Sequence, residues 1–177
     1  EKYKMPLIVG VNQLEHEKAS WENSIESLRL AFGNKIVLVQ FPVEQGAGFN
    51  SFIDVLKMKK YFFKDDNGTR EEMEIPAEFV SRAEELHQTL AEMAAENDES
   101  LMETFFEKGN LTEEEIRKGL KIGLSKGEMM PVFCLSGKRD IGVKRLMEFI
   151  IDVAPTPENS TQKLKDGTLV PCDTSGQ

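Results

Sequence analysis

Short continuous apolar runs mark the first and last strands that this chain predicts. They lie at Met5–Val11 and Met129–Leu135, and each breaks into polar residues. Such runs are typical of buried parallel strands, whose carboxyl ends open into loops at one edge of a sheet. We therefore expect the two segments to be neighbours in a parallel sheet, although a long stretch of chain separates them.

Apolar residues at spacings of three and four predict helices between and after these strands. Ser20 is a favourable N-cap for a helix that ends at Gly33. A longer helix begins at Pro76 and runs to about Asn97, with an apolar stripe on one side and glutamates on the other. Further helices are expected at 99–107, after the capping box that Thr112 and Glu115 form, and at 142–151.

The region after the first helix is rich in residues that favour β-strands. Ile36–Val43, Phe49–Leu56 and Met58–Phe63 carry many β-branched and aromatic residues, and the turn signal Asp65–Gly68 follows them. We interpret this region as a small antiparallel sheet. No Gly-x-x-x-x-Gly-Lys-Ser pattern occurs in the chain, so the glycines that follow Val43 are expected to shape turns rather than to hold a phosphate.

Composition narrows the class of protein. The 177 residues are 40% hydrophobic and carry a net charge of −9, as in a soluble globular protein with an acidic surface. That charge argues against a direct nucleic-acid site, which needs clustered basic residues. No apolar run approaches the roughly 20 residues that span a bilayer. Cys134 and Cys172 indicate neither a disulfide framework nor a metal site. We expect a cytoplasmic monomer that does not contact a membrane.

The loops that follow the two apolar runs resemble motifs of known proteins. Asn12–Glu15 resembles the Asn-Lys-x-Asp motif of GTPases, and Ser136–Lys138 resembles their Ser-Ala-x motif. The similarity extends from about Pro6 to Pro157 and is to elongation factor G, a translational GTPase. Other segments that resemble this family are Ile75–Glu78, Asn97–Glu103, Leu111–Ile116 and Met130–Cys134.

The resemblance implies an α/β fold. The chain would be the C-terminal part of a P-loop-type GTPase parallel sheet with its helices, interrupted by an α+β insert subdomain. Residues 1–34 and 128–157 would belong to the GTPase domain, residues 35–127 would form the insert, and residues 158–177 would be a linker or tail toward a next domain.

In this family the phosphate-binding loop, both switch segments and the magnesium ligands precede the Asn-Lys-x-Asp motif. We therefore expect this chain to be a fragment of a longer protein. Phosphoryl transfer depends on those missing parts, so the chain alone should not hydrolyse GTP. The parent would bind GTP or GDP with magnesium, whereas the fragment itself is expected to hold no cofactor.

The family's guanine site can be carried over by position. The motif's carboxylate accepts hydrogen bonds from the ring NH and the amino group of guanine, and Glu15 would take this role. Asn12 would tie the two loops together and Gln13 would cover the base. A backbone NH of the second loop would receive the guanine carbonyl oxygen. The candidate nucleotide-binding residues are therefore Asn12, Gln13, Glu15, Ser136, Gly137 and Lys138. No catalytic and no metal-binding residue is predicted.

Two departures from the family pattern affect selectivity. Glu15 is one methylene longer than the usual Asp, so its carboxylate must tilt or retreat to keep a two-point contact. Hydrogen bonds to charged groups contribute about 1.5–3 kcal/mol, and poor geometry would lose much of that. Gln13 lacks the positive charge of the usual Lys. We therefore expect weakened or lost guanine selectivity in the parent protein.

Several functions stay open at this point. The resemblance implies that the parent acts on the ribosome in translocation, and that the insert meets ribosomal stalk proteins, with its acidic helix as a contact surface. Alternatively, the parent is a diverged paralogue with weak or no GTP turnover. A sister family, such as ribosome-protection proteins or a peptide-chain release factor, is a third reading. A stand-alone protein-binding module is the fourth.

Overall fold

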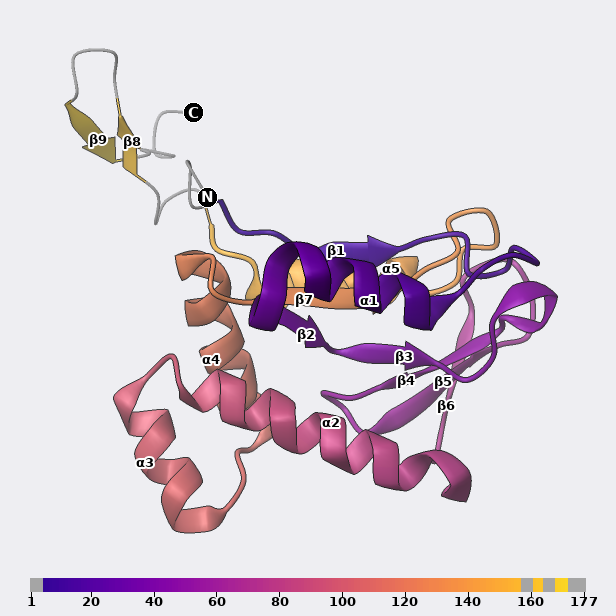
Figure 1. The fold of residues 1–177 in the computed structure, drawn as a ribbon, viewed down its shortest axis with the longest axis horizontal. Coiled ribbons are helices and arrows are strands. Elements are labelled where there is room, and N and C mark those ends of the chain that lie inside the picture. The colour runs from indigo at the N-terminus through magenta and orange to yellow at the C-terminus, as the bar shows by residue number, and fades with distance from the viewer. Residues whose placement is uncertain (1–4, 157–160, 164–167, 172–177) are drawn as a thin grey trace.

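The protein has an α/β fold in which a parallel sheet and an antiparallel sheet are flanked by helices (Figure 1). The computed structural model describes residues 5–156, 161–163 and 168–171. Its helices are α1 (Trp21–Phe32), α2 (Ala77–Ala95), α3 (Glu99–Lys108), α4 (Glu113–Lys126) and α5 (Val143–Val153). Its strands are β1 (Val9–Val11), β2 (Ile36–Leu38), β3 (Gln40–Pro42), β4 (Ser51–Asp54), β5 (Lys59–Phe63), β6 (Arg70–Met73), β7 (Met130–Cys134), β8 (Thr161–Lys163) and β9 (Leu169–Pro171).

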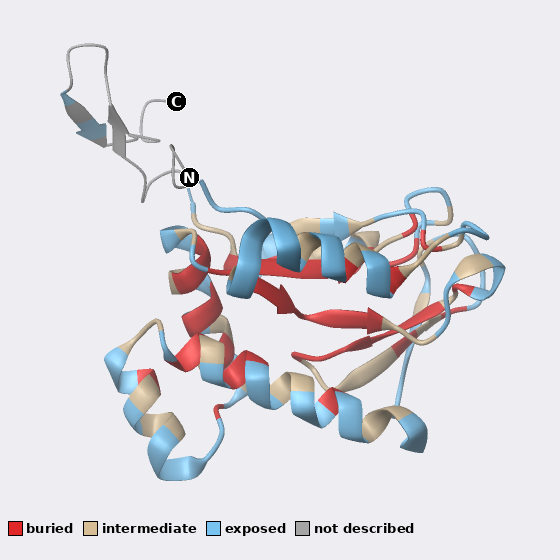
Figure 2. Ribbon diagram, viewed as in Figure 1, coloured by how far each residue is buried: buried red, intermediate tan, exposed pale blue. Residues whose placement is uncertain are grey.

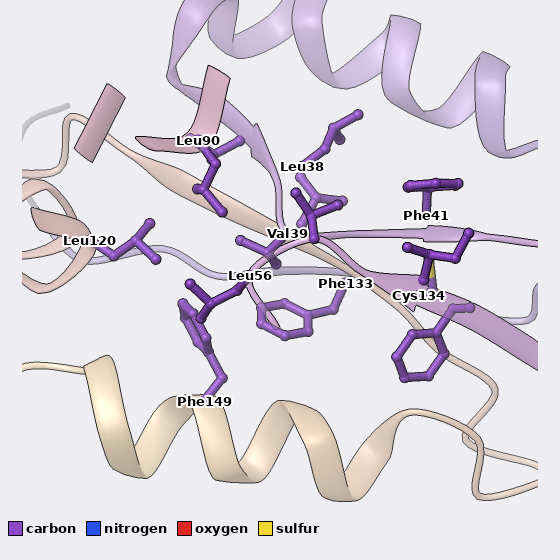
Figure 3. Packing of buried hydrophobic residues seen from close by; sticks show 14 of the residues in the cluster. Leu38, Val39, Phe41, Leu56, Leu90, Leu120, Phe133, Cys134 and Phe149 are labelled. Atoms are coloured by element: carbon purple, nitrogen blue, oxygen red, sulfur yellow. The ribbon is translucent and has the colours of Figure 1, made fainter. Parts of the chain in front are cut away.

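The parallel sheet has the strand order β1-β7-β2. Val132 in the central strand lies opposite Val9 on one side and Leu38 on the other. All residues of β7 are buried, as expected for a strand covered on both faces. Helices α1 and α5 lie on opposite faces of this sheet (Figures 1 and 3). The predicted pairing of the first and last apolar runs is therefore confirmed.

The first strand is shorter than the predicted Met5–Val11. Only Val9–Val11 is a strand, and the side chains of Met5 and Leu7 are 63% and 41% exposed. Pro131 of β7 lies opposite the segment just before Val9 and has no amide hydrogen to donate. The hydrogen-bonded pairing of β1 with β7 therefore begins only at Val9, because Pro131 cannot donate to the residues before it. The apolar pattern of Met5–Val11 contains no sign of this limit.

The predicted run Ile36–Val43 divides between the two sheets. Its first part, β2, pairs in parallel with β7, whereas its second part, β3, pairs antiparallel with β4. Assigning all of this run to the antiparallel sheet was therefore wrong. The side chain of Gln40 bridges the division, because its Oε1 accepts a hydrogen bond from the amide of Cys134 at 3.1 Å. The division of the chain at residues 34/35 and 127/128 into domains stays a prediction.

The antiparallel sheet has the order β3-β4-β5-β6, and the predicted strands at its centre are confirmed. The turn signal at 65–68 lies in the hairpin between β5 and β6, as its composition indicated. The strand after that turn, β6, was not predicted because its sequence Arg-Glu-Glu-Met is mostly charged. A half-exposed edge strand needs few apolar residues, so its pairing is decided by β5 rather than by its own pattern.

The helices begin and end close to the predicted positions. Ser20 caps α1 through a hydrogen bond from the amide of Asn23, and Thr112 and Glu115 form the predicted capping box. Helices α2 and α4 approach so closely that a side chain at Gly119 would overlap the carbonyl of Ala94. Within the part of the chain that the structure describes, no helix is both long enough and apolar enough to cross a membrane.

The hydrophobic core is continuous through both sheets and the inner sides of the helices (Figure 2). In the layer between the parallel sheet and α5, the ring of Phe133 packs edge-on against Phe149, with 4.9 Å between their centroids (Figure 3). Trp21 and Leu14 are also almost fully buried, at 1% exposure each. The start of α1 and the loop before it are therefore anchored in the core.

Most residues of the predicted tail, 158–177, lie outside the described residues. Two described pieces, Thr161–Lys163 and Leu169–Pro171, pair as antiparallel strands, with Gln162 opposite Val170. The sequence did not predict this strand pair, and the assignment of the segment as a linker or tail stays a prediction.

Candidate functional site

The first candidate loop follows β1 and is fixed from both sides at Leu14. The amide of Leu14 donates to the carbonyl of Leu135 at 3.3 Å, and its carbonyl accepts from the amide of Gly46 at 2.7 Å. Because the Leu14 side chain is also buried, the loop has a rigid centre. Asn12 and Gln13 on one side of it are exposed, whereas Glu15 on the other side is half-buried.

The second candidate loop follows β7 and closes on itself. Ser136 and Ile141 exchange two backbone hydrogen bonds of 3.0 Å each. The hydroxyl of Ser136 accepts a further hydrogen bond from the amide of Arg139 at 3.2 Å, and the Ser136 side chain is fully buried. Gly137 and Lys138 are exposed at the tip of the loop. Ser136 therefore shapes the loop from inside, whereas its neighbours are free to face a ligand.

A side-chain hydrogen bond joins the tips of the two loops. Oδ1 of Asn12 accepts from the amide of Gly137 at 2.9 Å. The amide of Leu135 also donates to the carbonyl of Val11 at 2.9 Å, which continues the β1–β7 ladder into the loops. The six candidate residues thus lie on two loops that are held side by side at the carboxyl edge of the parallel sheet, where α/β folds bind ligands.

The backbone is locally strained in both loops. Among the described residues, the non-glycine positions with positive φ are Gln13 at 64°, Met58 at 51° and Asp140 at 51°. Gln13 and Asp140 belong to the first and second loop respectively. Such conformations cost about 1–3 kcal/mol and tend to gather at functional sites, where surrounding contacts impose them. Their placement agrees with loops that are shaped for a ligand.

A shallow hollow of about 230 Å³ opens beside the first loop, between that loop and the start of α1. Its polar lining includes Asn12, Gln13, His16, Lys18 and Ser20. Oε2 of Glu15 is buried and has no hydrogen-bond partner among the described residues. Glu15 is not among the residues that line the hollow.

The antiparallel sheet supports both loops through residues that the sequence did not single out. The side chain of Arg139 donates from Nη1 to the carbonyl of Phe49 at 2.8 Å and from Nε to Asp66 at 2.7 Å. Near the first loop, Oε1 of Gln45 accepts from the amide of Trp21 at 2.6 Å. These contacts join residues far apart in sequence, so no local signal could have revealed them.

A second arginine–aspartate pair lies deeper in the molecule. Nε of Arg145 on α5 donates to Oδ2 of Asp54 on β4 at 2.6 Å, and both side chains are at most 2% exposed. We call this the inner pair, and the Arg139–Asp66 pair the outer pair. The charge of Asp54 raises the pKa of Arg145 against the effect of burial, so the arginine stays charged. Burial and the Asp54 charge together raise the pKa of the nearby Tyr61 phenol.

Cys134 lies at the end of β7, directly before the second loop. It is fully buried, and burial raises the pKa of its thiol well above the ordinary value. A thiol that stays protonated is a poor nucleophile. Cys134 therefore serves the core beneath the loops rather than any reaction at their surface.

Comparisons with known proteins give a structural likeness. A search of protein families finds no family model that matches the chain. Among solved structures, the chain is similar to a crystal structure of a protein from Thermus thermophilus, with 31% sequence identity and a TM-score of 0.77. The match covers 88% of this chain and 23% of the Thermus chain, so the chain spans under a quarter of the protein it resembles. The likeness confirms the α/β fold over most of the chain.

Proposed function

We propose that this chain is the guanine-recognition part of a translational GTPase of the elongation factor G kind. The observation that carries the proposal is the hydrogen bond from the Gly137 amide to Oδ1 of Asn12. This contact supports a loop-tying role for Asn12, as the Asn-Lys-x-Asp motif would require. It also brings the two motifs to the same edge of the sheet from opposite ends of the chain.

The geometry supports specific roles for the remaining loop residues. The Oε2 atom of Glu15 is buried, so the carboxylate would have to turn outward to accept the donors on the guanine edge. The amide of Gly137 is already bound to Asn12, which leaves the next amide, that of Lys138, as the donor for the guanine carbonyl oxygen. Adenine presents no matching pair of donors to Glu15. The selectivity of the site would therefore depend on this carboxylate.

The parent protein would use GTP and magnesium, and its phosphate and metal ligands would lie outside this chain. Exposed apolar side chains support the idea that more protein covers this part: Met147 and Ile151 on α5 are 52% and 79% exposed. Large apolar groups that gather on one face usually mark a contact surface. The parent would act on the ribosome, reaching its stalk proteins through the insert. The glutamates along α2 that would form this contact are exposed.

A diverged paralogue with weak or no GTP turnover is the second candidate. Its supporting observation is that Glu15 is half-buried and one methylene longer than the usual Asp, which limits how its carboxylate meets a base. Gln13 adds no positive charge beside the nucleotide. A ribosome-binding or other protein-binding module would keep the fold and the α2 surface while losing selectivity for guanine.

Ribosome-stimulated GTP hydrolysis by the full-length protein separates the candidates. It should be measured beside the double variant Gln13→Lys/Glu15→Asp, with GDP and ADP binding as a second readout. Similar hydrolysis by both proteins supports a working translational GTPase. A slow natural protein and a fast double variant support the paralogue. A full-length protein that binds GDP no better than ADP, with or without the substitutions, contradicts guanine recognition.

A further inference from the structure

One short segment of the chain touches both candidate loops. It runs from Gln45 to Phe49, between β3 and β4, and we call it the bridge segment. At one end, the amide of Gly46 donates to the carbonyl of Leu14 in the first loop at 2.7 Å. At the other end, the carbonyl of Phe49 accepts from Nη1 of Arg139 in the second loop at 2.8 Å.

The bridge segment is itself rigid. The amide of Phe49 donates to the carbonyl of Gly46 at 2.9 Å, and the Phe49 side chain is fully buried. Gln45 adds a second attachment, because its Nε2 donates to Glu22 at 3.2 Å while its Oε1 accepts from the amide of Trp21. A rigid segment bound at both ends fixes the separation of the two loops.

Arg139 is the side chain that completes this connection. Its guanidinium binds the Phe49 carbonyl and the Asp66 carboxylate at once, and its own amide binds the Ser136 hydroxyl. A planar guanidinium can serve two acceptors in fixed directions, which a lysine ammonium does less well. Arg139 therefore orients the second loop relative to the bridge segment as well as to the antiparallel sheet.

We infer that Arg139 is a positioning residue for guanine recognition, acting through the bridge segment of the antiparallel sheet. The inference rests on the proposed function, because the distance it fixes is that between the Glu15 carboxylate and the amides of the second loop. A base that is read from two loops needs both at a set separation. Small displacements of such groups weaken binding strongly.

The test measures fluorescent GDP and ADP binding to the full-length protein and to its Arg139→Met variant. Methionine keeps much of the side-chain length but removes all donors. We expect GDP to bind about tenfold more weakly, with a smaller GDP-to-ADP preference, because the second loop is no longer held at a set distance from the first. Arg139→Lys should fall between the two proteins. Arg29→Met, which changes an exposed arginine on α1, is the matched control and should bind as the natural protein does.

Amide hydrogen exchange separates a failure of this inference from a failure of the proposed function. In the Arg139→Met variant, the Gly137 amide, which binds Asn12, should exchange faster, whereas amides in β7 should not change. If the natural protein prefers GDP and Arg139→Met keeps both its affinity and its preference, the positioning role is wrong. If the natural protein does not prefer GDP, the proposed function is wrong, and unchanged Gly137 exchange would then also overturn the loop-positioning role.

Discussion

The two arginine–aspartate pairs join the antiparallel sheet to the rest of the molecule in different environments. In the inner pair, the side chains of Arg145 and Asp54 are 2% and 1% exposed, whereas in the outer pair those of Arg139 and Asp66 are 25% and 57% exposed. When a buried charge loses its partner, no water can solvate it and the folded state is strongly destabilised. When an exposed charge loses its partner, water solvates it and the cost is small. We therefore expect the inner pair to stabilise the fold and the outer pair mainly to position the second loop.

The largest expected effect comes from breaking the inner pair. Arg145→Met leaves the Asp54 carboxylate buried without its partner, and such changes cost about 3–5 kcal/mol of unfolding free energy. Urea denaturation measures the loss. The double variant Arg145→Met/Asp54→Asn should regain much of it, because the amide oxygen can still accept from the Lys57 amide that now binds Asp54. Equal stability of the single variant and the natural protein would contradict the assigned role of the inner pair.

Two glycines offer a matched comparison, one at the start of the helix that carries Arg145 and one in the turn that carries Asp66. Gly142 begins α5 with φ of 79°, and a Cβ there would overlap the carbonyl of Cys134. Gly68 lies in that turn with φ of 73°, and its Cβ would overlap the flexible carboxylate of Asp140, which can move away. Gly142→Ala should therefore cost about 2–4 kcal/mol, from strain and overlap together. Gly68→Ala should cost about 1 kcal/mol, from strain alone. Thermal unfolding measures both, and equal losses would contradict the comparison.

Tyr61 tests the polar surroundings of the inner pair. Its side chain is fully buried, and its hydroxyl has no hydrogen-bond partner among the described residues. Tyr61→Phe removes that hydroxyl but keeps the ring, over which the Arg70 guanidinium lies at 4.6 Å. Unfolding free energy should stay the same or rise by up to about 1 kcal/mol, because an unpaired polar group is lost. If denaturant titration shows that the variant is less stable than the natural protein, the hydroxyl has a hydrogen-bond partner and the prediction is wrong.

The smallest effect on stability is expected at the outer pair. Arg139→Met should lower the unfolding free energy by about 0.2–1 kcal/mol, as for exposed ion pairs. The loss should shrink further in molar salt, because salt screens exposed charges more than buried ones. Urea titrations at low and high salt, with Arg145→Met as the counterpart, make this comparison. A loss at Arg139 as large as that at Arg145 would show that exposure does not separate the two pairs.

Local signals in the sequence predicted most of the individual elements. The Ser20 cap, the Thr112–Glu115 capping box and the apolar stripes placed the helices, because these interactions occur within one or two helical turns. The two motif-bearing loops were also predicted, since each follows a short apolar run. The predicted limits of two strands were wrong. The first strand begins at Val9 rather than at Met5, and Ile36–Val43 is divided between two sheets. Strand limits depend on the partner strand, which a local pattern does not contain.

The sequence by itself predicted the α/β class and the order of the helices and main strands, because hydrophobic spacing and caps are properties of neighbouring residues. The six candidate residues followed from the family resemblance and stay a prediction. Only the tertiary structure decided that Asn12 binds Gly137, that Arg139 joins Asp66 and Phe49, and that Arg145 is buried against Asp54. The physical reason is that each of these contacts joins separate elements. Burial and hydrogen bonding between such elements exist only once the chain has packed.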